Sequence, residues 1–214
     1  MTERWPALPE SIERASVRLR AGAVIAFPTD TLYAVAALDS DRKAVERLYA
    51  VKRRPASQPL VLLVRGGEDF EKVAVLTGQA RDLIRRFWPG PLTLVLPSRL
   101  EPGATVAGRA PDHPVALALL EATGEPLASS SANRAGQPPP SDADSVIGGL
   151  GEDLDVVLDG GPCRLAQPST ILDLSGRQPK ILRAGALSAS DLHLDCCRGW
   201  QFRIMSGCCR RPAT

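Results

Sequence analysis

The sequence predicts one α/β domain, because short apolar runs typical of strands alternate along the chain with amphipathic stretches typical of helices. With 214 residues, 44% of them hydrophobic, the chain is long and apolar enough to bury one good core. Its 19 prolines and 18 glycines are scattered between the apolar runs, which indicates many turns between short elements. The last strands are joined by links too short for a helix, so several of them are expected to be antiparallel.

In the first half of the chain, the expected elements follow from apolar spacing and from helix-end signals. Helical periodicity predicts a helix over 11–21 and a second helix that Ser40 caps and that ends before Pro55. The other expected elements are strands over 23–27, 60–64 and 92–96 and helices over 68–76 and 77–87.

The second half continues the same alternation. Pro114 at the first position and Gly124 just past the end favour a helix over 114–123. The other expected elements are strands over 105–109, 126–130, 155–158, 169–174 and 180–182 and a short helix over 143–150. The apolar pattern fades after Leu187, so we expect a domain over 1–187 and an appendage of unknown role over 188–214.

The basic residues are mostly arginine, 22 of 26. The planar guanidinium suits phosphate or nucleic acid. The same composition also fits a protein that prefers arginine to lysine on an ordinary surface, because 24 acidic residues leave a net charge of only +2. Composition therefore leaves both interpretations open.

The chain has no apolar run of the roughly 18 residues that a membrane span needs, and its first residues do not resemble a signal peptide. Its five cysteines are an odd number, and four of them form adjacent pairs at 196–197 and 208–209. This arrangement is not that of a secreted disulfide scaffold, and adjacent cysteines lack the spacing of a zinc site. We expect a cytoplasmic protein with no membrane partner and no metal held by its own side chains.

Candidate chemistry must rely on Arg, Lys, Ser, Thr and Asn. The glycine-rich loops that usually bind phosphate are absent from the sequence, and the only histidines are His113 and His193. This composition argues against a His-dependent triad or a His-rich metal site. His113 is interpreted as a loop residue.

Two pairs of polar residues stand near expected strand ends. Pro55 favours an extended Arg54, and residues two apart in an extended segment point to one side, so Lys52 and Arg54 are expected to face one ligand. Ser131 and Asn133 have the same spacing beyond an expected strand. At the carboxyl end of a sheet these groups suit a polyphosphate nucleotide. They also suit a solvated basic turn and a Ser/Asn cap, and their pattern alone does not decide.

Seven segments resemble, in order, the YrdC-like threonylcarbamoyl-AMP synthase family. They are PTDTLYAVA (28–36), KRRPASQPL (52–60), WPGPLTLVL (88–96), RAPDHP (109–114), SSSANRAGQPPP (129–140), PSTILDL (168–174) and ILRAGAL (181–187). The resemblance implies a twisted, open, mixed α/β sheet with helices packed on it and a concave basic cavity. It also implies a nucleotidyltransferase that makes threonylcarbamoyl-AMP and pyrophosphate from L-threonine, bicarbonate or CO₂, and ATP.

The resemblance also implies a role, partners and site residues. The product would serve the N6-threonylcarbamoyladenosine (t6A) modification of tRNA through a downstream threonylcarbamoyl transferase complex, with possible contact to tRNA itself, and Mg²⁺ would accompany ATP. The implied catalytic residues are Lys52 and Arg54. The implied ATP ligands are Lys52, Arg54, Gln58, Thr105, Ser129, Ser131, Asn133 and Arg183. The implied L-threonine ligands are Thr31, Arg109 and Ser169.

The sequence departs from the family pattern at several positions. Ala34-Val35-Ala36 stands where Gly-Leu-Gly is usual, and Ala135, Ala166 and Ala184 replace Ser, Gly and Pro. An alanine forced to positive φ costs about 1 kcal/mol. These departures keep open an RNA-binding paralogue with weak or no synthase activity, although such modules usually expose aromatic residues, which make up 4% here. A carbamoyl-transfer domain of hydrogenase maturation is disfavoured because the chain has no partner domain or zinc-finger segment.

Overall fold

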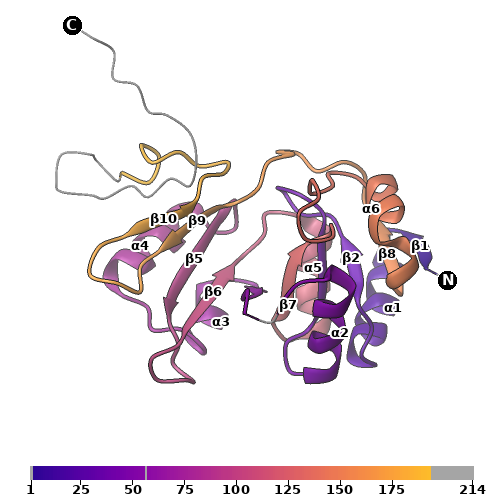
Figure 1. Ribbon diagram of the computed structural model, residues 1–214, viewed down its shortest axis with the longest axis horizontal. Helices are drawn as coiled ribbons and strands as arrows, with labels where there is room; N and C mark the ends of the chain where they lie inside the picture. The colour runs from indigo at the N-terminus through magenta and orange to yellow at the C-terminus, as the bar shows by residue number, and fades with distance from the viewer. Residues whose placement is uncertain (1, 56, 194–214) are drawn as a thin grey trace, which may run out of the picture.

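A computed structural model of the chain describes residues 2–55 and 57–193. In this part of the chain one mixed ten-stranded sheet with helices on both faces confirms the predicted α/β class (Figure 1). The strands are β1 (Glu3–Pro6), β2 (Ile25–Phe27), β3 (Ala34–Leu38), β4 (Val61–Leu63), β5 (Leu92–Pro97), β6 (Thr105–Arg109), β7 (Leu127–Ser131), β8 (Val156–Asp159), β9 (Thr170–Asp173) and β10 (Lys180–Arg183). The helices are α1 (Pro9–Arg20), α2 (Arg42–Lys52), α3 (Gly67–Glu71), α4 (Gly78–Phe87), α5 (Pro114–Thr123), α6 (Ala143–Leu150) and the 3₁₀-helix η1 (Gly151–Asp153).

The cap of α2 lies one residue later than the sequence predicted. The Asp41 carboxylate accepts hydrogen bonds from the backbone N–H groups of Lys43 (3.0 Å) and Ala44 (3.1 Å). The predicted cap, Ser40, instead donates its hydroxyl proton to Glu125 at 2.6 Å. The prediction was wrong because this tertiary contact uses the Ser40 hydroxyl, while the adjacent carboxylate satisfies the first amides of the helix.

The sheet has the strand order β1-β8-β2-β3-β7-β4-β6-β5-β9-β10. Strands β9 and β10 are antiparallel, as expected for their short link. By contrast, β8 runs parallel to β1 and β2, while β9 runs parallel to β5 in the other half of the sheet. The segment 160–169 therefore crosses the molecule from one half to the other, as the orange trace in Figure 1 shows.

The two faces of the sheet are covered unequally by helices. Helices α1 and α5 share one apolar cluster with alternate residues of β2, β3, β7 and β8. Helices α2 and α6, and then α3 and α4, pack on the opposite face. Neighbouring residues of β7 show the division, since Leu127 packs with α1 and α5 and Ala128 packs with α3 and α4. On the α1–α5 face, strands β4, β5, β6 and β9 thus keep a surface that no described helix covers.

The sequence prediction missed two strands, β1 and β3. All five residues of β3 are buried, and they alternate between the clusters on the two faces of the sheet. A strand that is apolar on both sides shows no polar alternation, and three of its five residues, Ala34, Ala36 and Ala37, are alanines, which carry a weak strand signal. Strand β1 is a short edge strand that pairs only with β8 in the described sheet.

The end of the described chain is still packed against the domain. Leu192 is buried in the same apolar cluster as Leu83 of α4. Packing therefore continues past the expected boundary at Leu187, and most of the expected appendage, with both adjacent cysteine pairs, lies outside the described residues. Within residues 2–55 and 57–193, no helix combines the length and hydrophobicity of a membrane span.

Ala166, in the crossing segment, adopts the left-handed backbone conformation with φ of 48°. Ala34 and Ala36 do not have positive φ, so these two departures from the family pattern cause no such strain. We expect Ala166→Gly to raise the free energy of unfolding by about 0.5–1 kcal/mol, the relieved strain less the added entropy of the unfolded chain. Urea denaturation measures the change.

The control for this prediction is Ala135→Gly. Ala135 is exposed and lacks positive φ, so glycine there should lower the free energy of unfolding. Equal effects of the two substitutions would contradict the strain at Ala166.

Candidate active site

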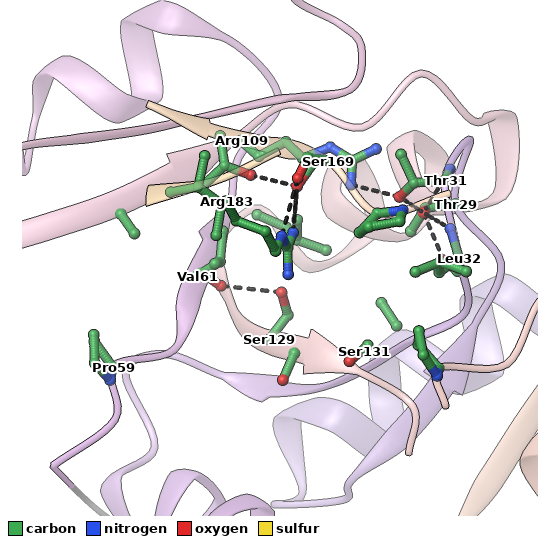
Figure 2. Close-up of a pocket in the computed structure, with 18 of the residues that line it drawn as sticks. Thr29, Thr31, Leu32, Pro59, Val61, Arg109, Ser129, Ser131, Ser169 and Arg183 are labelled. Carbon is green, nitrogen blue, oxygen red and sulfur yellow. Dashed lines mark hydrogen bonds between the residues drawn. The ribbon is translucent and has the colours of Figure 1, made fainter. Parts of the chain in front are cut away.

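A cavity of about 410 Å³ opens on the uncovered part of the α1–α5 face (Figure 2). Alternate residues of β4, β5 and β6, the serines of β7 and Ile171 of β9 form its floor, and the loops around residues 29–33, 57–59 and 168–169 contribute to its walls. Three arginines, Arg54, Arg109 and Arg183, line the cavity, and none of its described lining residues is Asp or Glu. The charged side chains among the described lining residues are thus all cations, a set that suits an anionic ligand.

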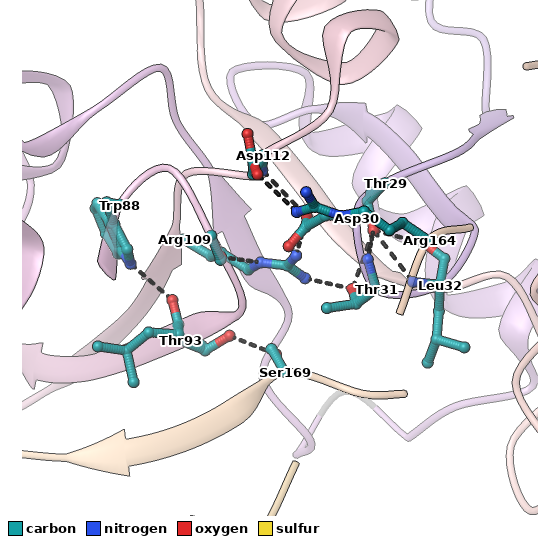
Figure 3. A network of polar contacts seen from close by, with 12 residues as sticks. Thr29, Asp30, Thr31, Leu32, Trp88, Thr93, Arg109, Asp112, Arg164 and Ser169 are labelled. Atoms are coloured by element: carbon teal, nitrogen blue, oxygen red, sulfur yellow. Dashed lines mark hydrogen bonds and ion pairs between the residues drawn. The ribbon is translucent and has the colours of Figure 1, made fainter. Parts of the chain in front are cut away.

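Arg109, the last residue of β6, is fixed by one partner on each of its three nitrogens (Figure 3). Nε donates to the Gly90 carbonyl at 2.9 Å, Nη1 donates to Thr31 Oγ1 at 2.7 Å, and Nη2 forms an ion pair with Asp30 Oδ1. The side chain lines the cavity although the residue is only 6% exposed. A guanidinium has five N–H bonds, so two of them have no partner among the described residues, and two is the number that a bidentate carboxylate needs.

Asp30 lies behind Arg109 and orients it. It is 1% exposed, and its Oδ1 also accepts a hydrogen bond from the Asp112 backbone N–H at 3.1 Å. Its Oδ2 has no hydrogen-bond partner among the described residues. Burial lowers the pKa of Arg109 from its usual value, and the charge of Asp30 opposes that shift. Burial alone would disfavour the charged form of Arg109, and the ion pair with Asp30 allows the cation to stay buried in a fixed orientation.

Ser169, just before β9, belongs to a second cluster of hydroxyls and cations. Its Oγ lies 2.8 Å from Thr93 Oγ1, and Arg183 donates to the Ser169 carbonyl (2.9 Å) and to its Oγ (3.0 Å). Thr93 was not among the residues that the sequence indicated. Its signal was present, however, because Thr93 is the one polar residue in the run Leu92–Pro97, and it faces the cavity while Leu92 and Leu94 face the core.

The other wall of the cavity contains Arg54 and the serines of β7. Arg54 donates from Nη1 to Ser130 Oγ (3.1 Å) and from Nη2 to the Pro59 carbonyl (2.8 Å). Ser129 Oγ donates to the Val61 carbonyl at 3.0 Å, and Ser131 also lines the cavity. Gln58 lines this wall as well. The described partners of Arg54 are neutral, so its charge is not cancelled by a carboxylate among them. Together with the hydroxyls it forms a surface that can bind phosphate oxygens.

Lys52 and Asn133 are not part of the described lining. Lys52 is 2% exposed, and its Nζ donates to the carbonyls of Ser131 and Asn133. Burial, together with the charge of Arg54, lowers the pKa of Lys52 to about 8. Asn133 donates to the carbonyls of Arg134 and Gln137, and its Oδ1 has no described partner. Lys52 thus fixes the turn after β7, and its direct contact with ATP stays a prediction.

The predicted extended geometry of residues 52–54 is wrong. Lys52 is the last residue of α2, and Arg53 adopts the left-handed conformation (φ 49°) that ends the helix. A left-handed residue thus replaces the extended one that the prediction assumed. Both side chains still reach the end of β7, Lys52 at the Ser131 carbonyl and Arg54 at Ser130 Oγ, but only Arg54 lines the cavity. Arg53 itself is exposed.

Thr105, predicted as a nucleotide ligand, lies outside this cavity. It is exposed at the start of β6 and lines a second hollow of about 560 Å³, which Ser98 and Glu101 also line. The segment around Ser57 and Pro59 borders both hollows. The remaining predicted residues, Thr31, Arg54, Gln58, Arg109, Ser129, Ser131, Ser169 and Arg183, line the first cavity together.

Comparison with known proteins identifies the family. The Sua5/YciO/YrdC family model, described as "Telomere recombination", matches residues 17–185. The chain belongs to this family. A putative threonylcarbamoyl-AMP synthase of Mycobacterium tuberculosis (strain H37Rv) is 40% identical over 201 residues, which cover 88% of this chain and 92% of the relative. The threonylcarbamoyl-AMP synthase of Pyrococcus abyssi is 38% identical over 196 residues, covering 86% of this chain and 58% of that protein.

The structure of P. abyssi Sua5 complexed with L-threonine has the same fold as this family member. It gives a TM-score of 0.84 at 37% sequence identity and covers 91% of this chain and 59% of that chain. The present chain thus spans less than two thirds of the length of both P. abyssi proteins, while it matches nearly the full length of the mycobacterial relative.

Proposed function

We propose that this protein is an L-threonylcarbamoyladenylate synthase. The observation that carries the proposal is that one cavity combines a set of side chains suited to a carboxylate with a set suited to phosphates. Arg109, Thr31 and Ser169 form the first, and Arg54 with the β7 serines forms the second. Arg183 lies between them, and its pKa is lowered by burial and by the charges of Arg109 and Arg54. Cations that disfavour one another in this way gain stability when a polyanion enters.

The proposed reaction starts when the amine of L-threonine attacks CO₂ and loses a proton, or attacks bicarbonate with loss of water, to form a carbamate. A carbamate oxygen attacks the α-phosphorus of ATP, the bond from that phosphorus to the bridging oxygen breaks, and pyrophosphate leaves with the electron pair. In this proposal Arg109 holds the threonine carboxylate, while Arg54 and Arg183 neutralise the charge that moves toward the leaving group. The protein's main contribution is alignment and charge neutralisation, which the fixed arginines supply.

Mg²⁺ enters this proposal as part of the substrate MgATP. The described residues that line the cavity offer hydroxyls, amides and carbonyls, whereas a protein site for Mg²⁺ usually adds one or two carboxylates. The residues do not fit a resident Mg²⁺ site, and no step is assigned to an ion held by the protein.

The names of the mycobacterial and P. abyssi relatives support the same activity for this chain. We place the product in the t6A modification of tRNA, where a transferase complex would consume it, with the protein in the cytoplasm. The RNA-binding alternative gains no support from the cavity, because its one aromatic lining residue, Tyr33, is fully buried and cannot stack on a base.

We expect ATP turnover by the pure protein to require L-threonine and bicarbonate together and to release pyrophosphate. Labelled bicarbonate should appear in a threonine-dependent adenylate. Reactions that lack one substrate are the controls, and a filter-binding titration with tRNA tests the RNA-binding alternative. Release of orthophosphate without a need for threonine would contradict the proposal.

A further inference from the structure

The hydroxyl of Thr29 has a fixed hydrogen-bond direction. Its Oγ1 lies 2.6 Å from the Leu32 carbonyl oxygen, which can only accept. The single proton of Thr29 Oγ1 is therefore committed to Leu32. The same oxygen is also approached by the backbone N–H groups of Thr31 (3.2 Å) and Leu32 (3.3 Å), so toward every other neighbour it acts as an acceptor.

The direction of the Thr29 hydrogen bond determines where the proton of the Thr31 hydroxyl points. Thr31 Oγ1 lies 3.0 Å from Thr29 Oγ1, and since the Thr29 proton points to Leu32, a hydrogen bond in this pair runs from Thr31 to Thr29. The two lone pairs of Thr29 Oγ1 are then shared by this proton and the two longer backbone N–H contacts. One lone pair of Thr31 Oγ1 accepts the Arg109 Nη1–H at 2.7 Å. Both threonines are 2% exposed, so bulk water does not compete for these groups. Thr31 lines the cavity, and the second lone pair of its Oγ1 has no partner among the described residues.

We propose that Thr29 is a positioning residue that makes Thr31 a pure hydrogen-bond acceptor toward the cavity. The subsite then selects an amino acid that places an N–H or O–H donor on Thr31 while its carboxylate takes the two free N–H bonds of Arg109. A ligand oxygen that lacks a proton is repelled at Thr31 and directed to Arg109. This inference rests on the proposed function and adds the hydrogen-bond polarity of its amino-acid subsite.

The test compares Thr29→Val with Thr29→Ser. Valine keeps the shape of threonine but removes the oxygen, which leaves the Thr31 proton without its acceptor and free to turn toward the ligand. Calorimetric titration should show L-threonine binding weakened about tenfold or more in Thr29→Val and changed by less than about threefold in Thr29→Ser. Binding of a non-hydrolysable ATP analogue should stay the same in all three proteins, because Thr29 lies in the amino-acid subsite.

A merely structural role of Thr29 would lower the unfolding temperature of Thr29→Val without changing the affinity of the folded protein. If Thr29→Val does not fold, Thr29→Ala takes its place in the test, because alanine also lacks the side-chain oxygen. Titration of the wild type with O-methyl-L-threonine identifies the donor. If O-methyl-L-threonine binds much more weakly than L-threonine, the donor to Thr31 is the side-chain hydroxyl of the ligand. If it binds equally well, the donor is the amine. Both results agree with the inference.

Two results overturn the inference while leaving the proposed function intact. One is wild-type affinity for L-threonine in Thr29→Val, and the other is an equal loss in folded Thr29→Ser and Thr29→Val. Failure of the wild type to bind L-threonine would instead remove the proposed function itself.

Discussion

Arg54→Ala is expected to lower kcat at saturating MgATP by on the order of a hundredfold or more, the typical cost of losing a preorganised charged donor. Arg54 lines the cavity, and its guanidinium is held against Ser130 and Pro59. As the bond to pyrophosphate breaks, negative charge shifts toward the leaving group. A fixed cation stabilises that charge more in the transition state than in the bound substrate. Steady-state pyrophosphate release measures the effect.

Arg53→Ala is the matched control for this prediction. Arg53 is the adjacent arginine, but it is exposed and does not line the cavity. Its removal should leave kcat and both KM values near those of the wild type. If Arg53→Ala were as damaging as Arg54→Ala, general loss of positive charge in this segment would explain both, and the specific role of Arg54 would have to be abandoned.

The sequence predicted most helices and strands because their signals are local. Helix α5, for example, has Pro114 in its first turn and Gly124, with φ of 72°, at its end. The pairing of distant strands was not accessible in the same way. No local signal indicates that β8 and β9, only ten residues apart, lie in opposite halves of the sheet. That arrangement follows from burial of both faces of the sheet, which is a property of the whole chain.

The candidate site was predictable where side-chain chemistry alone marks it. Arg109 and Ser169 were indicated by their motifs, and both line the cavity. Asp30 lies in one of these motifs but was assigned no role, because its role depends on its position behind Arg109, which only the folded chain creates. For Lys52 the side-chain chemistry predicted a ligand contact. In the structure its ammonium group instead donates to two backbone carbonyls.

The second large effect is expected at Arg109, and its buried ion pair determines which substitution can test it. Arg109→Ala leaves the Asp30 carboxylate buried without its partner, which typically costs about 3–5 kcal/mol in the free energy of unfolding. Kinetics of that variant would therefore mix binding with stability. Arg109→Lys keeps the charge beside Asp30 and removes the planar fork that can hold a carboxylate through two N–H bonds.

Arg109→Lys is accordingly expected to raise the KM for L-threonine by about tenfold or more, with a much smaller change in the KM for ATP and in kcat. The threonine carboxylate keeps its charge throughout the reaction, so its contact with Arg109 contributes equally to binding of the substrate and of the transition state. Arg164→Lys is the control, because Arg164 is an exposed arginine that pairs with Asp112 at 2.7 Å and does not line the cavity. Equal increases in both KM values for Arg109→Lys would show that the residue shapes the whole cavity, and its role as the carboxylate ligand would then be wrong.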